Sequence, residues 1–265
     1  MEGDQPKLAI IFCGKGKRIT DDEKLAWHPD IDVYFQPNAW MDTNVNLQWT
    51  EKTLKSFVEN QKLEKYVLLL DNLEAHCTEE FKTAVNQQNG LVWYGLADGT
   101  DLWQPVDAGY AQVLKSLISK EHQDWLDRDE NADRWFQNDN PYSAKERRIL
   151  ITLWAGEAWK KLSKPEYDHL RKSCWVKTGC LLTSDGSEDN LVKPEGLTDY
   201  KVPPPSLCDP APNHPESIDP LQVDITVAEQ STTWLAEDEL VLPDHEEADK
   251  ENNIFDIIDG FSLEN

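Results

Sequence analysis

The sequence predicts an α/β fold followed by an acidic tail. Apolar strand-like runs alternate with helix-like stretches over the first half of the 265-residue chain. The clearest run is "YVLLL" (Tyr66–Leu70), which is apolar at every position. After about Asp185 prolines and acidic residues dominate and apolar residues are sparse. Because such a composition buries little apolar surface, we expect the fold to end before the tail, which we predict to be disordered.

The first half of the chain predicts three strands and a helix. "KLAIIFC" (Lys7–Cys13) and "IDVYFQP" (Ile31–Pro37) read as short strands, the second of which ends at a proline. Apolar residues recur at three- and four-residue spacing over Thr43–Asn60, which is typical of a helix. Tyr66–Leu70 then predicts a strand that helices cover on both faces.

Further elements follow in the same alternating order. Thr78 begins a helical stretch with acidic residues in its first turn and Gly90 at its end. "LVWYGL" is a short strand, and "DAGYAQVLKSLISK" is helix-like. Residues 140–178 read as a helical appendage and form the one basic region of the chain, with nine basic and four acidic residues.

The organisation that we predict has three parts. Residues 1–125 form an α/β domain, 126–182 a helical appendage and 183–265 an acidic, proline-rich tail. The formal net charge is −24, and residues 183–265 hold 21 acidic and 3 basic residues. The remaining 29 acidic and 23 basic residues leave the first 182 residues close to balanced. The excess negative charge therefore belongs to the tail, through which protein partners could bind.

Cysteine usage and hydropathy narrow the class of protein. The five cysteines are odd in number and scattered, which favours free thiols in a reducing compartment. His169, Cys174 and Cys180 could be zinc ligands, but their spacing matches no compact zinc finger. No run of 18 apolar residues exists, and the N-terminus lacks the pattern of a secretory signal, so we expect no membrane partner.

Two aspartates follow predicted strands. Asp71 comes directly after Tyr66–Leu70, and Asp107 follows the next strand at the start of a helix. Open α/β sheets place their sites at the carboxyl ends of strands. A pair of carboxylates there suits Mg²⁺, which prefers oxygen ligands. Taken singly, however, an Asp after a strand is more often a turn residue or a helix cap.

The sequence segments around these aspartates resemble those of a known protein family. "LLLDNLEAH" contains Asp71, Asn72 and His76, and "DGTDLWQPVDAGYAQVLKSL" contains Gln104 and Asp107. Together they resemble the DDE-type transposase catalytic domain of the pogo/Tigger branch of the mariner superfamily. In that family an apolar strand ends in Asp-Asn with a His shortly after, and a later Gln-Pro-Leu-Asp supplies the last acidic ligand. Here valine replaces the leucine.

Three further stretches are similar to the same family and extend the resemblance to about residues 7–192. They are "IIFCGKGKRI", "AWMDTNVNLQW" and "LWAGEAWKKLS". The resemblance implies an RNase H-like mixed sheet with flanking helices, and nuclear localisation. It implies phosphodiester chemistry in which Mg²⁺ is bound by Asp71 and Asp107, with Asn72, His76 and Gln104 in supporting roles.

The chain also departs from the family pattern. The first catalytic Asp of such transposases lies upstream of the glycine-lysine strand, and here only Met1–Pro6 precede that strand. The N-terminal helix-turn-helix region of these enzymes has no counterpart in the chain. We therefore expect an incomplete sheet that resembles the C-terminal part of a transposase. With two of three carboxylates, Mg²⁺ should bind weakly and most or all catalysis should be lost.

Two functions remain open from the sequence. One is a transposase-derived DDE endonuclease-domain protein that binds DNA weakly, with Lys160, Lys161, Arg171 and Lys172 as the contacts. A solvated helix face explains these basic residues equally well. The other is a domesticated interaction module, in which the fold is a scaffold and the acidic tail binds partners. The tail favours the second function, because its charge repels phosphate.

Overall fold

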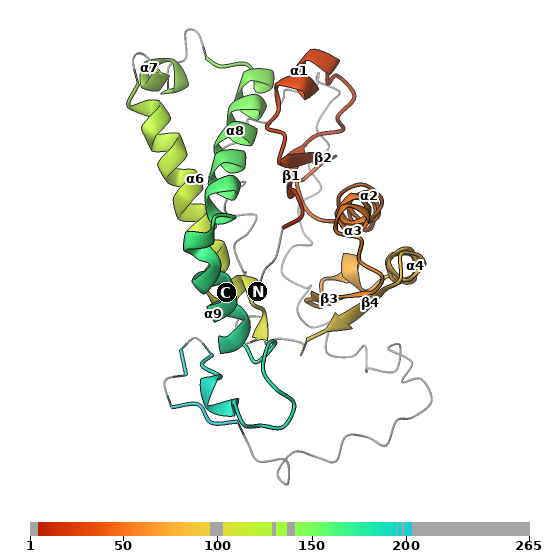
Figure 1. Ribbon diagram of the computed structural model, residues 1–265. Coiled ribbons are helices and arrows are strands. Elements are labelled where there is room, and N and C mark those ends of the chain that lie inside the picture. Colours follow the sequence, from red (N-terminus) through yellow and green to blue (C-terminus); the bar gives the residue numbers. More distant parts are fainter. Residues whose placement is uncertain are drawn as a thin grey trace, which may run out of the picture. The chain divides into compact units, whose positions relative to one another are not determined.

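The computed structural model describes residues 5–95, 103–128, 131–136, 141–194, 196–197 and 199–202. Short strands and helices alternate up to residue 94, and helices follow (Figure 1). This arrangement confirms the α/β class. The acidic tail lies outside the described residues apart from its first part, so its predicted disorder stays a prediction.

The first two strands form a parallel pair. β1 (Leu8–Cys13) and β2 (Ile31–Gln36) pair in register from Leu8 opposite Ile31 to Cys13 opposite Gln36. The short helix α1 (Asp21–Ala26) lies in the connection, and the Thr20 side chain caps its first turn. Both strands agree with the sequence prediction.

A bulged helix follows the first pair. The helical run that we predicted over Thr43–Asn60 consists of α2 (Thr43–Trp49), the π-helical segment η1 (Thr50–Leu54) and α3 (Lys55–Gln61). Asp42 caps α2, because its Oδ1 accepts from the Val45 amide at 2.8 Å. The Thr50 hydroxyl donates to the Asn46 carbonyl at 2.9 Å, and side-chain bonds of this kind compete with the regular helical ladder.

The second strand pair is also parallel. β3 (Tyr66–Leu70) pairs with β4 (Gly90–Tyr94). The 3₁₀ turn η2 (Glu74–His76) and helix α4 (Glu79–Gln87) connect the two strands. Leu54, Val58, Phe81 and Val85 are buried in a core that also holds the inner-facing side chains of the two strands. Gly90 begins β4 rather than ending α4, since the helix ends one turn earlier and Asn89 has a φ of 60°.

Among the described residues, β3 is covered on one face only, and the predicted cover of its second face is not confirmed. Val67 of β3 is 57% exposed, and Leu91 and Trp93 of β4 are 58% and 51% exposed. Within the described residues the two strand pairs are separate sheets, β1–β2 and β3–β4. An unbroken apolar run cannot distinguish a strand buried on both faces from one with an open apolar face. Both pairs are parallel, and the mixed RNase H-like sheet stays a prediction.

The C-terminal half of the described chain is helical. Its elements are η3 (Val106–Tyr110), α6 (Ala111–Leu126), α7 (Asn131–Phe136), α8 (Ala144–Leu162), η4 (Pro165–Tyr167), α9 (Asp168–Lys177) and η5 (Asp189–Leu191). Ser143 caps α8 in a reciprocal arrangement with Glu146, in which each side chain binds the other residue's main chain. The helical appendage that the sequence indicated is thus built mainly on α8 and α9.

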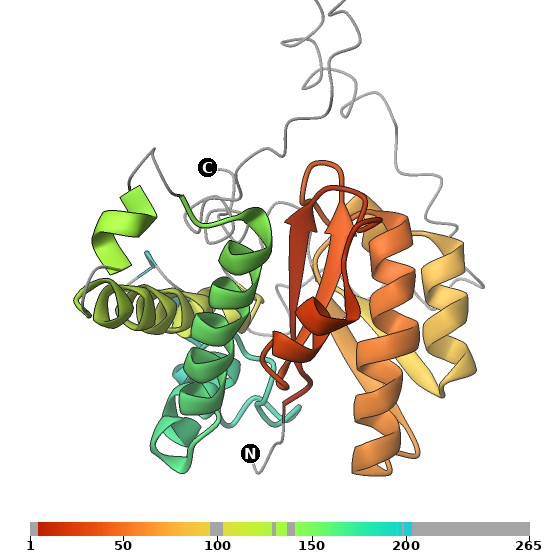
Figure 2. The same cartoon turned by 90° about the horizontal axis from the view of Figure 1, so that it is seen from above.

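One core joins β1–β2 to these helices. Ile10 and Phe12 of β1 pack in a cluster with Ile118 of α6 and with Ile151 and Trp154 of α8. Helices α6 and α8 lie on one side of the pair, and α2 and α3 lie on the other (Figure 2). The core therefore crosses residue 125, and the domain boundaries stay a prediction. No helix in the described part of the chain is long and apolar enough to cross a membrane.

Two buried contacts hold α8 against α1 and against the residues before β2. Glu23 of α1 is 1% exposed and accepts from Nε and an η nitrogen of Arg148 at 2.7 and 3.1 Å. His28, just before β2, lies against Gly156, where a Cβ atom would stand 2.0 Å from the imidazole Cγ. The ring and the helix can approach this closely because residue 156 has no side chain.

Candidate functional site

Asp71 lies directly after β3, where its carboxylate is bound by two donors. Oδ1 accepts from Nδ1 of His76 at 2.6 Å and from the Leu73 amide at 3.2 Å. Because a carboxylate only accepts, His76 carries its proton on Nδ1 in this contact. The hydrogen bond from His76 lowers the pKa of Asp71 below its ordinary value, against an opposing effect of burial. Asp71 is therefore ionised at neutral pH, as a metal ligand must be.

The neighbouring elements hold His76 in place. The Tyr94 hydroxyl at the end of β4 donates to the His76 carbonyl, and the imidazole lies tilted against the Phe81 ring of α4, with ring centroids 6.0 Å apart. Asn46 of α2 is fully buried and donates to the Ala75 carbonyl at 2.9 Å. The sequence did not single out Asn46 or Tyr94. Asn46 could have been identified from the sequence, because an amide side chain next to Val45 on the apolar face of a helix requires a hydrogen-bond partner.

Asn72 and Trp103 link β3 and β4 to the segment that contains Gln104 and Asp107. The Asn72 amide donates to the Gly95 carbonyl at 3.0 Å, and the Gly95 amide donates to the Leu70 carbonyl at 3.2 Å. Trp103 packs on Gly95 so closely that an added Cβ would meet its indole at 1.8 Å. The same indole stands edge-on to Trp93, with ring centroids 6.2 Å apart. These contacts bring the segment with Gln104 and Asp107 to the end of the β3–β4 pair.

Asp107 begins the turn that leads into α6. The Gln104 carbonyl accepts from the amides of Asp107 and Ala108, at 3.1 and 3.2 Å. Gly109 takes a φ of 110°, which a residue without Cβ adopts at little cost. Gln104 thus supports Asp107 through its main chain.

Thiols of the C-terminal helix region hold this turn from the other side. Cys174 donates to the Ala108 carbonyl and Cys180 to the Trp103 carbonyl, both at 3.3 Å. In the part of the chain that the structure describes, no group of three or more His, Cys, Asp or Glu side chains could hold a metal. The zinc hypothesis for His169, Cys174 and Cys180 is therefore wrong, because the two thiols serve as donors to main-chain carbonyls.

The donor set suits Mg²⁺ only in part. Both hydrogen bonds of Asp71 described above use Oδ1, and the side chain is 33% exposed. A carboxylate in this state is an ordinary ligand for a hard cation. The assignment of Asp71 and Asp107 as metal ligands stays a prediction.

The four basic residues that we predicted to bind nucleic acid differ in their exposure and in their ion pairs. Lys161 of α8 is paired with Glu121, and Arg171 of α9 is paired with Asp168 and also donates to the Leu162 carbonyl. Lys160 lies 3.5 Å from Glu157, but its side chain is 60% exposed. Lys172 is exposed on α9. Lys160 and Lys172 are thus more accessible to a phosphate than Lys161 and Arg171.

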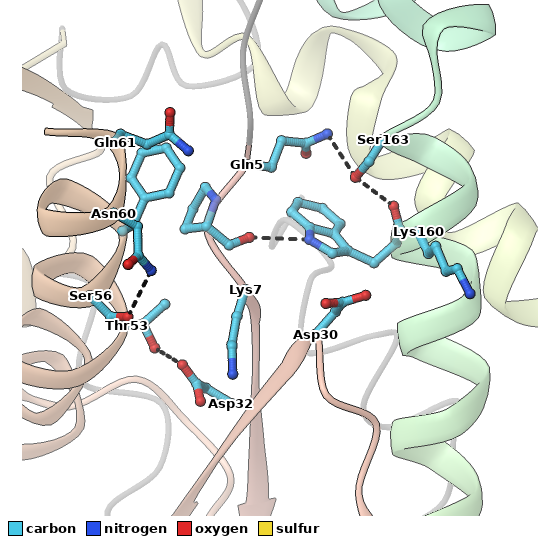
Figure 3. A pocket seen from close by; sticks show the side chains of 13 residues that line it. Gln5, Lys7, Asp30, Asp32, Thr53, Ser56, Asn60, Gln61, Lys160 and Ser163 are labelled. Carbon is cyan, nitrogen blue, oxygen red and sulfur yellow. Dashed lines mark hydrogen bonds between the residues drawn. The ribbon is translucent and has the colours of Figure 1, made fainter. Parts of the chain in front are cut away.

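A separate pocket lies at the amino-terminal ends of β1 and β2, with a cavity volume of about 380 Å³. Figure 3 shows Lys7 between Asp30 and Asp32. Lys160 of α8 lies across the cavity from Asn60. Asp32 is already bound by the Thr53 hydroxyl at 2.6 Å and by Lys52 at 2.9 Å. Charges of both signs share this cavity, so its lining does not select an anionic ligand.

Asp71, which His76 orients, lies at the end of β3, and Asp107 lies in the turn that leads into α6. The family described as DDE superfamily endonuclease matches residues 2–166, and the chain belongs to this family. No curated protein and no solved structure is similar enough to the chain to count as a match.

Proposed function

We propose that this protein is a transposase-derived nucleic-acid-binding protein of the pogo/Tigger type, that it acts in the nucleus, and that the 265-residue chain by itself has little or no nuclease activity. Family membership supports the descent from a DDE endonuclease. The observation that carries the proposal is the Asp71–His76 pair, which keeps an ionised carboxylate at the end of β3.

In this proposal Asp71 and Asp107 are the residues that would hold Mg²⁺, and they would hold it weakly. When bound, the ion supplies charge stabilisation for a phosphate oxygen. His76 orients Asp71, and Asn72 fixes the main chain after β3 through the Gly95 carbonyl. With these two carboxylates as its ligands, an ion would be held loosely and would align the attacking and leaving oxygens poorly.

DNA binding in this proposal depends on exposed basic residues of α8 and α9. Each lysine that neutralises a phosphate contributes about −0.9 to the slope of log K against log salt for duplex DNA. We expect Lys160→Ala with Lys172→Ala to flatten the slope by nearly two such contributions. Lys161 and Arg171 are held by carboxylates, so their replacement should change the slope less.

The test is fluorescence anisotropy with a labelled duplex over a series of salt concentrations, using the full chain. Lys120→Ala is the matched control, because Lys120 is an exposed lysine on α6 outside the proposed contact surface. Equal slopes for the wild type and the Lys160/Lys172 double variant would contradict the proposed surface. Removing residues 183–265 should raise affinity, because a polyanion with 21 acidic residues no longer competes with DNA.

A second function is favoured by the charge of the tail. With 21 acidic and 3 basic residues, residues 183–265 repel phosphate and suit basic protein partners. In this alternative the fold is a scaffold and the tail is the binding element. Retention of protein partners by residues 183–265, together with no measurable DNA affinity of the full chain at low salt, would favour it over the first function.

A further inference from the structure

The outer face of the β3–β4 pair is an apolar surface that the rest of the described chain leaves open. Its residues are Val67, Leu91 and Trp93, each more than half exposed, with Leu69 beside them on β3. We call these four residues the outer sheet face. The opposite face packs on α3 and α4 through Leu68 and Val92.

Parallel sheets in proteins are normally covered by helices on both faces. The outer sheet face departs from this rule, and its exposed side chains form a contiguous set because they alternate along two paired strands. Val67 lies opposite Leu91 in the register, and Leu69 lies opposite Trp93. Two cross-strand pairs of large apolar side chains are a surface that an amphipathic helix can cover.

The chain contains a segment whose pattern fits this surface. In "NIFDIIDGFSL", Ile254, Ile257, Ile258 and Phe261 recur at i, i+3, i+4 and i+7, the spacing of one helical stripe. Asp256 and Asp259 lie between them and off that stripe. Lys62 and Lys65 are exposed in the turn before β3, with the exposed Glu64 between them, and the two lysines have the charge that complements these aspartates.

The connection is long enough for the segment to reach the face. About 50 residues separate Val202, the last described residue, from Ile254, and a flexible chain of that length has an r.m.s. end-to-end distance of roughly 40 Å. A unit of about 200 residues is also roughly 40 Å across. A tethered segment is present at an effective concentration near the millimolar range, so even weak apolar contacts suffice for docking.

From these observations we infer that residues 254–263 dock as an amphipathic helix on the outer sheet face of their own chain. The acidic tail then returns to the folded part at its C-terminal end, and the helix supplies the second cover that the parallel pair requires. Because β3 ends at Asp71, docking also brings acidic residues to the strand pair that carries the candidate site. This inference is independent of the proposed DNA binding.

Hydroxyl-radical footprinting of the full chain, read by mass spectrometry at Trp93 and Leu91, tests the inference. The test variant replaces Ile254, Ile257, Ile258 and Phe261 with serine. The control variant replaces Leu235, Leu240, Val241 and Leu242 with serine, which removes the same number of apolar residues from another part of the tail. We expect oxidation of Trp93 to rise several-fold in the test variant alone, at every protein concentration.

Three results would overturn the inference. Equal oxidation of Trp93 in all three chains would show that the segment does not cover the face. A rise in the control variant would assign the face to the earlier apolar run of the tail. Protection of Trp93 that grows with protein concentration, and that the serine replacements do not affect, would assign the face to a second copy of the chain. Amide exchange of residues 66–70 and 90–94 in each variant shows whether the strand pair itself remains folded.

Discussion

The Nδ1 atom of His76 donates to the Oδ1 atom of Asp71 at 2.6 Å, which joins the end of β3 to the turn before α4. This bond is the main reason that the pKa of Asp71 is lowered. A carboxyl with a lowered pKa stabilises the folded state above its unfolded pKa, and that contribution is lost as the pH falls through the folded value. Asp71 therefore favours folding at neutral pH and loses this effect only in acid, below about 3.8.

Replacing His76 should raise the pKa of Asp71 towards its ordinary value. In His76→Ala the largest stabilising contact of the carboxylate is gone, while the desolvation that raises the pKa remains. Carbon-detected NMR of the aspartate carboxyl groups measures the change. His169→Ala is the control, since His169 is exposed and its ring contacts the Glu166 carbonyl. An unchanged Asp71 titration in His76→Ala would show that the main chain alone holds the carboxylate.

The buried ion pair between Glu23 and Arg148 should be costly to break. The Glu23 and Arg148 side chains are 2% and 13% exposed, so Glu23→Ala leaves a guanidinium with little access to water. Removing one partner of a buried pair typically costs about 3–5 kcal/mol of unfolding free energy. Urea denaturation of the full chain measures this loss.

The matched control for that prediction is the pair of Asp21 and Lys24 on the same α1 helix. Their side chains are 92% and 54% exposed, and exposed pairs contribute at most about 1 kcal/mol. We expect Asp21→Ala to change the unfolding free energy by no more than this amount. Equal effects of Glu23→Ala and Asp21→Ala would mean that α1 does not depend on its contact with α8.

His122 should make folding sensitive to mildly acidic pH. It is 7% exposed among the rings of Trp135 and Trp154, and this burial lowers its pKa below 6.5. The unfolded chain binds a proton near pH 6.5, whereas folded His122 binds one only at lower pH. The neutral histidine's contribution is therefore complete above pH 6.5 and lost as the pH falls from 6.5 towards the folded pKa.

Unfolding free energies measured between pH 7.5 and pH 5 test this effect, with pH values chosen to bracket the ordinary histidine pKa of about 6.5. We expect the loss of stability over this range to be smaller in His122→Phe, which cannot take up a proton. An identical pH dependence in the wild type and His122→Phe would show that other groups cause it.

Gly156→Ala should weaken the contact between α8 and the start of β2. The new methyl carbon would stand 2.0 Å from Cγ of His28, which is buried and binds Glu157 and the Asp30 amide. Overpacking of this kind costs about 1–3 kcal/mol, which exceeds the gain in helix propensity that alanine brings. Thermal unfolding gives the result, and Lys160→Ala is the control for an alanine at an exposed position of the same helix. A stabilised Gly156→Ala would contradict the packing of His28.

The strands and long helices could be predicted from periodicity because each has a local pattern. Tyr66–Leu70 and the helix from Ala144 show this, since apolar spacing and the Ser143 cap mark them directly. The outer sheet face could not be predicted, because the apolar run of β3 has the same pattern whether one face or both are covered. Helix α1 was missed, since its six residues bury only Glu23 and show no apolar stripe.

The candidate site could be predicted only in outline. The order of Asp71, His76 and Asp107 is visible in the sequence, and the resemblance gave these residues their roles. The supports of His76 come from α2 and β4, through Asn46 and Tyr94, and contacts between distant segments have no local signal. The pairing of Lys161 with Glu121 was hidden for the same reason, because 40 residues separate them.

The most direct test of the central claim is a cleavage assay with the purified full chain, supercoiled plasmid DNA, and Mg²⁺ or Mn²⁺. The claim is that the chain belongs to the DDE endonuclease family and, with Asp71 and Asp107 as its carboxylates, does not cut DNA on its own. We expect the wild type to nick the plasmid no faster than Asp71→Ala. Metal-dependent nicking by the wild type that Asp71→Ala abolishes would contradict the claim, because it would require a further carboxylate in the site.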